Sequence, residues 1–279
     1  MNFIFSPAIQ NFIGQFNNTF SPLILNNAKS LIGKGIVDVL SSEGAQVCIA
    51  DISEEHGIKA VSEIEKLGRK AIYVQANFEN SAEPKKVIEE CVNRLGNINI
   101  LVNNVGIQPS TSYKNVEETS EEVWDAIINI NLKSYFLMSK YSIPFMRRNG
   151  EGAIVNIASV QGLQSQKLVP PYAASKGAVL SLTRQMSLDY IKENIRINAI
   201  CPGTINTPMV TNSISGNINE SLKLFGKDIP IGRVGEPKEI GQVASFLCSD
   251  KASFISGEYI IVDGGIMAKG GWDTELQGE

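Results

Sequence analysis

Histidine is almost missing from this sequence. Among 279 residues there is one, His56. Zinc and other transition-metal sites rely heavily on imidazole ligands, and a Ser-His-Asp triad needs a histidine to move the proton. A single histidine argues against both kinds of site, and the sequence predicts no bound metal.

Cysteine is also scarce, and its spacing is uninformative for metal or disulfide chemistry. The four residues Cys48, Cys91, Cys201 and Cys248 lie far apart, and no Cys-x-x-Cys pair occurs. Isolated cysteines of this kind are typical of reduced, buried thiols in a cytosol-like compartment. The sequence therefore predicts a cytoplasmic protein.

An excess of positive charge and a long apolar run are both absent. The net charge is −4, which leaves no basic surface for nucleic acid. No segment approaches the ~18 consecutive apolar residues of a membrane span. We therefore expect neither a nucleic-acid nor a membrane partner.

Residues 1–20 carry no charged side chain, whereas a secretory signal has a basic start and a longer apolar block. We interpret them as an extension of unknown role.

Short apolar segments rich in β-branched residues alternate with helix-length segments. This alternation predicts an α/β fold, a Rossmann-like doubly wound parallel sheet covered by helices on both faces. No linker or repeat divides the chain, so we expect a single domain over residues 21–279. The predicted strands are 47–50, 71–74, 98–102, 153–157, 195–200 and 259–262, and the predicted helices are 54–67, 82–95, 121–146 and 172–193.

Residues 204–233 interrupt this pattern because they are polar, rich in Asn and Ser, and weakly periodic. They follow the carboxyl end of a predicted strand, which is where open parallel sheets bind their ligands. We therefore expect this segment to take part in ligand binding.

Tyr172 is the only one of the seven tyrosines with a lysine, Lys176, four positions later. On a helix this spacing places both side chains on one face. A nearby ammonium favours the phenolate and lowers the pKa of a tyrosine from ~10 toward a range useful for acid-base catalysis. Taken alone, the pair fits an amphipathic surface tyrosine better than a catalytic one.

Other motifs change that interpretation, because each lies where a predicted strand stops or a helix begins. They are Asn103-Asn104-Val105-Gly106, Asn131 in WDAIININ, Ser159 at the end of AIVNIAS, and Pro202-Gly203 after RINAI. With Tyr172 and Lys176, they occur in the order and near the spacings of one family. From about Ile32 to Gly265, the chain resembles the short-chain dehydrogenase/reductase family of the classical single-domain type.

The resemblance implies an oxidoreductase in which four residues perform the chemistry. Tyr172 would carry the proton, and Lys176 would lower its pKa and bind the nicotinamide ribose. Ser159 would hold the substrate oxygen, and Asn131 would anchor a water that relays protons to solvent. Taken singly, Ser159 fits a helix or turn cap equally well, and Asn131 fits a bond between neighbouring segments. Together in register, the four favour catalysis.

Asp51 closes the run VCIAD, eighteen residues after Gly33, close to the ~20 expected for an acid on the adenosine ribose. Its charge would repel a 2′-phosphate, which favours NAD over NADP, although Lys29 is a mild argument for NADP. Asn77 stands where the family usually has an aspartate at the adenine. The other residues that the resemblance places at the dinucleotide are Asn27, Ile32, Gly33, Asn104, Gly106, Tyr172, Lys176, Pro202, Gly203, Ile205 and Thr207.

The largest departure from the family lies in its phosphate loop, Thr-Gly-x-x-x-Gly-x-Gly. Here the chain reads NNAKSLIG, and only Gly33 remains of the three glycines. The glycines permit the tight turn and the close approach of backbone to pyrophosphate. Asn27 is tolerable where φ must be positive, but the Leu31 side chain is expected to occupy space that the phosphates need.

Two functional hypotheses therefore stand side by side. The first is an NAD(H)-dependent oxidoreductase acting on a small secondary alcohol or ketone. The second is a relative that keeps the fold but serves as a binding or scaffold subunit. A third explanation of the altered phosphate loop is that the first thirty or so residues are not the natural start.

The resemblance also implies a homo-oligomer, a tetramer packed through the helices 121–146 and 172–193, and a mobile substrate lid at 204–233. Residues that bear on the substrate are Gln108, Gln161, Gln164 and Gln166, which suggest polar contacts, and Met209 and Phe225 in the lid.

Overall fold

The computed structural model describes residues 22–26, 30–211 and 218–269. In this part of the chain seven strands form one parallel sheet in the order β3-β2-β1-β4-β5-β6-β7. The strands are β1 (Pro22–Asn26), β2 (Gln46–Asp51), β3 (Ala71–Gln75), β4 (Ile100–Asn103), β5 (Gly152–Ile157), β6 (Ile195–Pro202) and β7 (Tyr259–Val262). The predicted doubly wound sheet is confirmed.

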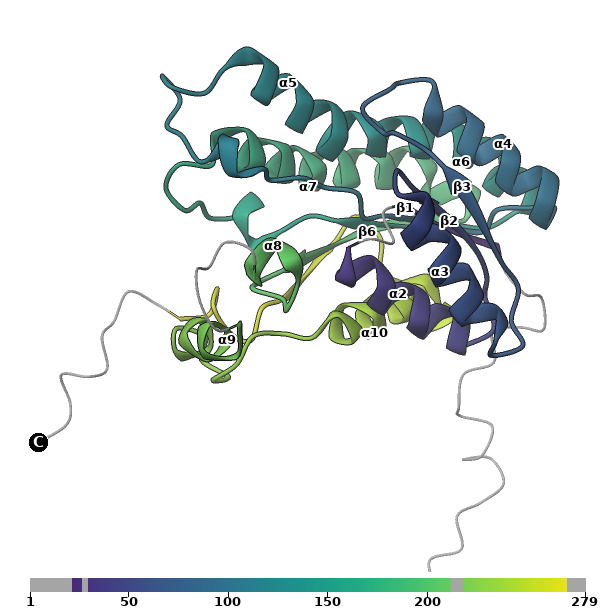
Figure 1. Ribbon diagram of the computed structural model, residues 1–279. Helices are drawn as coiled ribbons and strands as arrows, with labels where there is room; N and C mark the ends of the chain where they lie inside the picture. Colours follow the sequence, from purple (N-terminus) through teal and green to yellow (C-terminus); the bar gives the residue numbers. More distant parts are fainter. Residues whose placement is uncertain (1–21, 27–29, 212–217, 270–279) are drawn as a thin grey trace, which may run out of the picture.

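Helices cover both faces of the sheet, so the molecule has three layers (Figure 1). One face carries α4 (Glu83–Leu95), α6 (Ser134–Asn149) and α7 (Pro170–Tyr190), with α5 (Glu121–Ile128) beside them. The other carries α2 (Leu31–Ser42), α3 (Glu54–Glu65) and α10 (Pro237–Cys248). None of the helices in the described ranges is long and apolar enough to cross a bilayer.

Alternating side chains of the strands fill two separate cores, as the two-residue period of a strand requires. In β1, Leu23 and Leu25 pack toward α2 and α10, whereas Ile24 packs into the core under α4, α6 and α7. All three side chains are fully buried. Burial on both faces explains why the strands appear in the sequence as unbroken apolar runs.

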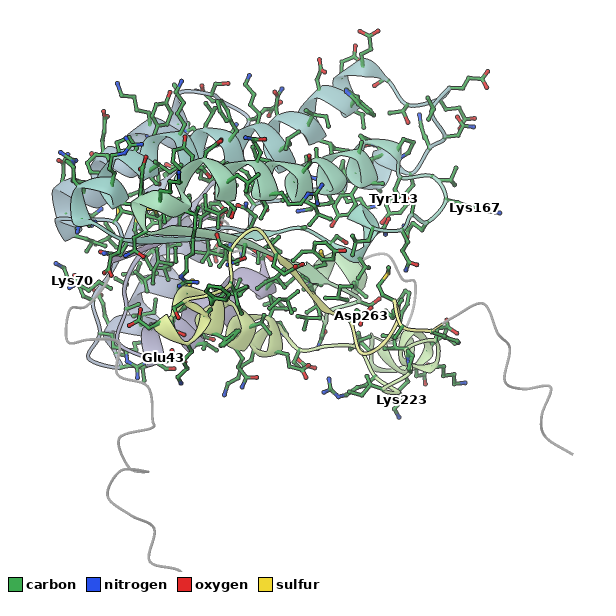
Figure 2. All side chains as sticks on the ribbon, turned by 180° about the vertical axis from the view of Figure 1, so that it is seen from behind. Glu43, Lys70, Tyr113, Lys167, Lys223 and Asp263 are labelled. Carbon is green, nitrogen blue, oxygen red and sulfur yellow. The ribbon has the colours of Figure 1, made fainter. Side chains whose placement is uncertain are left out.

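The strand order reverses at β1, which pairs with β2 on one side and β4 on the other. In open sheets of this kind the loops beyond the carboxyl ends of the strands diverge at such a point and leave a crevice for ligands. Figure 2 shows Tyr113 and Lys167 at one end of the molecule and Lys70 at the other. Tyr113 and Lys167 belong to loops that follow the carboxyl ends of strands, whereas Lys70 precedes the amino end of β3.

The predicted helix over 121–146 is found as an unbroken helical segment, 121–149, and it contains one irregular turn. A π-helical turn, Asn129–Lys133, separates α5 from α6. A π turn inserts one residue into the helical repeat and often marks a functional site, and this one contains Asn131. In the 204–233 segment the described residues form α8 (Pro208–Thr211) and α9 (Ile218–Lys227).

Candidate active site

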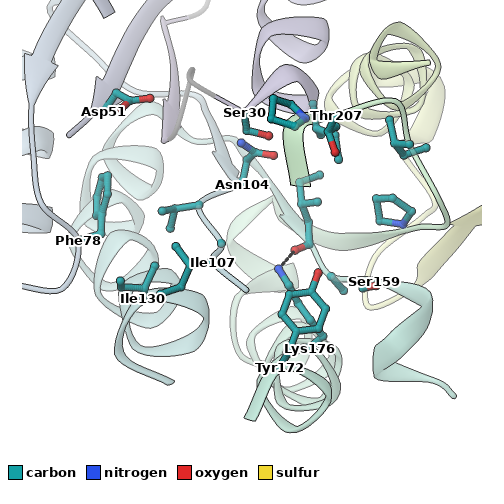
Figure 3. A pocket seen from close by; sticks show the side chains of 18 of the residues that line it. Ser30, Asp51, Phe78, Asn104, Ile107, Ile130, Ser159, Tyr172, Lys176 and Thr207 are labelled. Atoms are coloured by element: carbon teal, nitrogen blue, oxygen red, sulfur yellow. Dashed lines mark hydrogen bonds between the residues drawn. The ribbon is translucent and has the colours of Figure 1, made fainter. Parts of the chain in front are cut away.

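A cavity of about 440 Å³ lies at the carboxyl ends of the strands (Figure 3). Most of the predicted site residues line it, although they come from segments spread over more than 170 positions of the sequence. Gly33 is buried within α2 and does not line the cavity, and Asn27 lies outside the described residues. The predicted residues on its walls are Ile32, Asp51, Asn77, Asn104, Gly106, Ser159, Tyr172, Lys176, Pro202, Gly203, Ile205 and Thr207.

The structure brings the hydroxyl groups of Ser159 and Tyr172 together. Tyr172 lies in the first turn of α7, and Ser159 lies two residues after the end of β5, so one comes from a helix and the other from the loop after a strand. Burial raises the pKa of Tyr172 to about 12, and a hydrogen bond with Ser159 acts in the opposite direction. The phenol of Tyr113 lies close enough to raise this pKa a little further.

Lys176 lies one turn along α7, with its side chain in the same cavity. Its Nζ donates a hydrogen bond of 2.8 Å to the carbonyl of Ile157, and the residue is 3% exposed. Burial lowers the pKa of Lys176 to about 8, because the charged form loses its hydration.

In the chain without a dinucleotide, the pKa of Tyr172 is raised, and the lowering by Lys176 stays a prediction for the complete site. The ammonium points to a backbone carbonyl, and it lies 5.8 Å from the centre of the tyrosine ring. Burial is the dominant influence on the phenol, and its pKa lies above the ordinary value of 10.0.

Asn131, in the π turn, is fully buried, and its side chain forms hydrogen bonds with the backbone beyond β4. Its Oδ1 accepts the N–H of Ile107 at 2.8 Å, and its Nδ2 donates to the Ile107 carbonyl at 3.0 Å. The same Nδ2 lies 3.3 Å from the Ser175 hydroxyl on α7. Asn131 therefore fixes Ile107, which lines the cavity, against α7. A proton relay through a water bound to Asn131 stays a prediction.

Asp51 lies at the other end of the cavity from Tyr172 (Figure 3). It ends β2, is 2% exposed, and accepts the backbone N–H of Ser53 at 2.8 Å. The side chain of Phe78, next to the predicted Asn77, also lines this half. The cavity therefore has an acidic, partly aromatic end and a hydroxyl-rich end.

Asn26 is a structural residue of the site that the sequence patterns missed. At the end of β1 it is fully buried, and its Oδ1 accepts two backbone N–H groups, from Asn104 at 2.5 Å and from Val105 at 2.7 Å. Beside it, Asn103 donates to Asn156 at 2.9 Å. The signal was present, because Asn26 opens the altered phosphate motif, but its contact partners lie 78 and 79 positions away.

The predicted obstruction by Leu31 is not found among the described residues. Ser30 and Ile32 line the cavity, whereas Leu31, the first residue of α2, does not and is 36% exposed. Successive helical residues point about 100° apart, so Leu31 can face solvent while its neighbour faces the cavity. α2 itself is held firmly, because Gly35 and Gly241 allow the backbones of α2 and α10 to meet directly.

Comparison with known proteins agrees with this geometry. The family described as enoyl-(acyl carrier protein) reductase matches residues 27–267. A solved structure of Thermoplasma acidophilum aldohexose dehydrogenase superposes with a TM-score of 0.82 at 32% identity, covering 91% of this chain and 96% of that one.

Curated relatives match over similar lengths. An uncharacterised oxidoreductase of Thermotoga maritima is 39% identical over 248 residues, which is 88% of this chain and 97% of the relative. Cyclohexanol dehydrogenase of an Acinetobacter species is 38% identical over 258 residues, 91% of this chain and 97% of the relative.

The fold and the site define an oxidoreductase of the α/β, dinucleotide-binding type. The chain belongs to the classical short-chain dehydrogenase/reductase family. Members of this family use a nicotinamide dinucleotide, and the residues present fit one. The amino end of α2 opens at Ser30 on the cavity, a place suited to phosphate. A Cβ added to Gly106 would lie 3.4 Å from Lys176 Nζ, so the glycine leaves room beside the lysine.

Proposed function

We propose that the protein is an NAD(H)-dependent oxidoreductase that interconverts a secondary alcohol and a ketone. The observation that carries the proposal is the meeting of Ser159, Tyr172 and Lys176 on one part of a cavity whose other end holds Asp51. The names of two similar proteins, a cyclohexanol dehydrogenase and an aldohexose dehydrogenase, support a hydroxyl-bearing substrate.

The bound dinucleotide supplies or accepts the hydride. Tyr172 gives a proton to the oxygen of the ketone during reduction and takes one from the alcohol during oxidation, while Ser159 holds that oxygen by a hydrogen bond. In the chain alone, burial raises the pKa of Tyr172 to about 12, so the phenol is protonated at neutral pH before a dinucleotide binds. Lys176, with a pKa of about 8, exchanges protons near neutral pH and can restore the proton.

Asp51 supports NAD rather than NADP as the cofactor. Its carboxylate can accept hydrogen bonds from ribose hydroxyls, and it would repel a phosphate on the same sugar. Among the described residues that line the cavity, the only lysine or arginine is Lys176, at the far end. Asn77 would meet the adenine, and Asn104 and Gly106 would lie along the adenosine.

The altered phosphate loop favours a second function, that of a binding or scaffold subunit without turnover. Asn27 and Leu31 replace two glycines of the family pattern. Leu31 carries less weight than its sequence position suggested, because its side chain is not part of the cavity wall. The complete set of Asn131, Ser159, Tyr172 and Lys176 favours the enzyme.

Titration of the purified protein with NADH and with NADPH, followed by fluorescence, tests the proposal. We expect saturable binding of NADH and weaker binding of NADPH. Tyr172→Phe is the matched control, because it should bind NADH like the unmodified protein while lacking turnover. If neither dinucleotide binds, the scaffold function is the better explanation.

We also propose a homo-oligomer, a tetramer, in a reducing, cytoplasmic compartment. Trp124 on α5, Phe136 on α6 and Leu188 on α7 are 41%, 47% and 76% exposed in the single chain, and a subunit interface would cover them. The four cysteines are free and buried, as a reducing compartment allows. The 204–233 segment would act as the substrate lid.

A further inference from the structure

Tyr73, on β3, is bonded to the residue that the proposed function places at the adenosine ribose. Its hydroxyl donates a hydrogen bond of 2.9 Å to the backbone carbonyl of Asp51. Burial raises the pKa of Tyr73 to about 12, and the negative charge of Asp51 adds to this increase. The phenol is therefore protonated at neutral pH and acts as a donor. Tyr73 is not part of the cavity wall, so any effect on a bound dinucleotide must pass through Asp51.

The backbone at the end of β2 is held from β3 by several bonds. The N–H of Ala76 donates to the same Asp51 carbonyl at 3.1 Å. Tyr73 supplies the second donor, and the two lone pairs of a carbonyl oxygen can accept both. On the next peptide unit, the Gln75 side chain donates to the Ile52 carbonyl at 3.3 Å. The orientation of the peptide units that follow Asp51 is therefore set by side chains and backbone of β3.

The ring of Tyr73 also fixes the start of α3. Gly57, buried in the first turn of α3, lies so close to the ring that an added Cβ would overlap two ring carbons. The residue before α3 is Ser53, whose backbone N–H donates to the Asp51 carboxylate at 2.8 Å. The carboxylate is thus held between the end of β2 and the start of α3. One side chain contacts both: the hydroxyl of Tyr73 binds the strand end, and its ring packs on the helix.

We propose that Tyr73 is a positioning residue that holds Asp51 where the carboxylate accepts the ribose hydroxyl groups of NAD, and that it thereby sets the preference for NAD over NADP. This inference rests on the proposed function. A carboxylate that is free to turn away from the ribose loses its hydrogen bonds with NAD, and it also repels a 2′-phosphate less. Loss of the Tyr73 hydroxyl therefore acts on the two cofactors in opposite directions. A residue that only stabilised the fold would affect both alike.

Fluorescence titration of the purified protein with NADH and with NADPH measures this preference. Tyr73→Phe removes the hydroxyl and keeps the ring against Gly57, so the contact between β3 and α3 is retained. The ratio of the Kd for NADPH to the Kd for NADH should fall about threefold or more, a change in the range expected for one hydrogen bond. Tyr141→Phe is the matched control, because Tyr141 is a half-buried tyrosine of α6. In that variant the ratio should not change.

A double-mutant cycle separates a positioning role from a structural one. Asp51→Ala removes the carboxylate, so adding Tyr73→Phe to it should leave the Kd for NADH unchanged. The inference is overturned if Tyr73→Phe weakens NADH and NADPH by the same factor, or if it weakens NADH equally with and without the carboxylate. An unchanged ratio overturns it as well. If the unmodified protein binds neither dinucleotide, the proposed function itself fails, whereas NADH binding without coupling between residues 51 and 73 refutes the role of Tyr73 alone.

Discussion

Replacing Lys176 with methionine should remove a pH dependence of stability that the buried ammonium creates. The residue is 3% exposed, and burial lowers its pKa from 10.5 to about 8. Above pH 8 the folded chain releases this proton while the unfolded chain keeps it until pH 10.5. The unfolded state then binds more protons, and stability rises with pH through this window.

The magnitude follows from the size of the shift. Each pKa unit corresponds to about 1.4 kcal/mol, so the whole window is worth about 3 kcal/mol, and the interval from pH 7.5 to 9.5 about 2 kcal/mol. Methionine has a similar length and no titrating group. The free energy of unfolding of the native protein should therefore rise by about 2 kcal/mol relative to Lys176→Met over that interval.

Urea unfolding at several pH values, followed by circular dichroism without added dinucleotide, measures this difference. Other titrating groups occur in both proteins and largely cancel in the comparison. The Cys201 thiol, which interacts with Lys176, has a pKa of about 11 in the folded chain and stays protonated over this interval. Lys167→Met is the control, since Lys167 is exposed and its removal should leave the pH dependence unchanged. Parallel curves for Lys176→Met and the native protein would refute the argument that burial lowers this pKa.

Four further predictions concern the site and the assembly. Tyr172→Phe should reduce turnover by ~10²–10⁴-fold, as expected for loss of an acid-base group, with NADH affinity nearly unchanged; more than a tenth of native turnover would contradict the role of the phenol. Asp51→Ala should weaken NADH binding and narrow its advantage over NADPH in fluorescence titrations, and tighter binding of NADPH by the native protein would reverse the cofactor assignment. Leu31→Gly should change NADH affinity less than about threefold, because the side chain is not part of the cavity wall; a large gain would restore the steric argument. Light scattering should give the mass of a tetramer, and a mass near the 30.3 kDa of one chain would exclude it at the concentration used.

The strands were predictable because a strand buried on both faces is an unbroken run of apolar residues in the sequence. The runs at 98–102 and 195–200 predict β4 and β6 to within a few residues. The long helix was not predictable in its details, since a π turn depends on tertiary bonds. Asn131 reaches Ile107, 24 positions away, and no local pattern records that contact.

The site was predictable where it consists of motifs and unpredictable where it depends on burial. Ser159, Tyr172 and Lys176 were identifiable from spacing, and the structure brings them to one cavity. The direction in which the pKa of Tyr172 shifts could not be predicted from the sequence, because burial of the phenol is a property of the packed site. The hydrogen bonds from the backbone beyond β4 to Asn26 and the exposed position of Leu31 likewise depend on the packing of β1, β4 and α2.

The close contact at Gly162 makes tolerance to substitution uneven around the site. Even one methyl group there would collide with the carbonyl of Lys176 and separate the loop of Ser159 from the helix of Tyr172. On the opposite side, an added Cβ at Gly106 would lie 3.4 Å from Lys176 Nζ and 3.7 Å from Asn131 Oδ1, which are ends of side chains rather than backbone. Substitution of the glycine is therefore less constrained at residue 106 than at residue 162. Related chains of this family should therefore keep a glycine more strictly at the position of Gly162 than at that of Gly106.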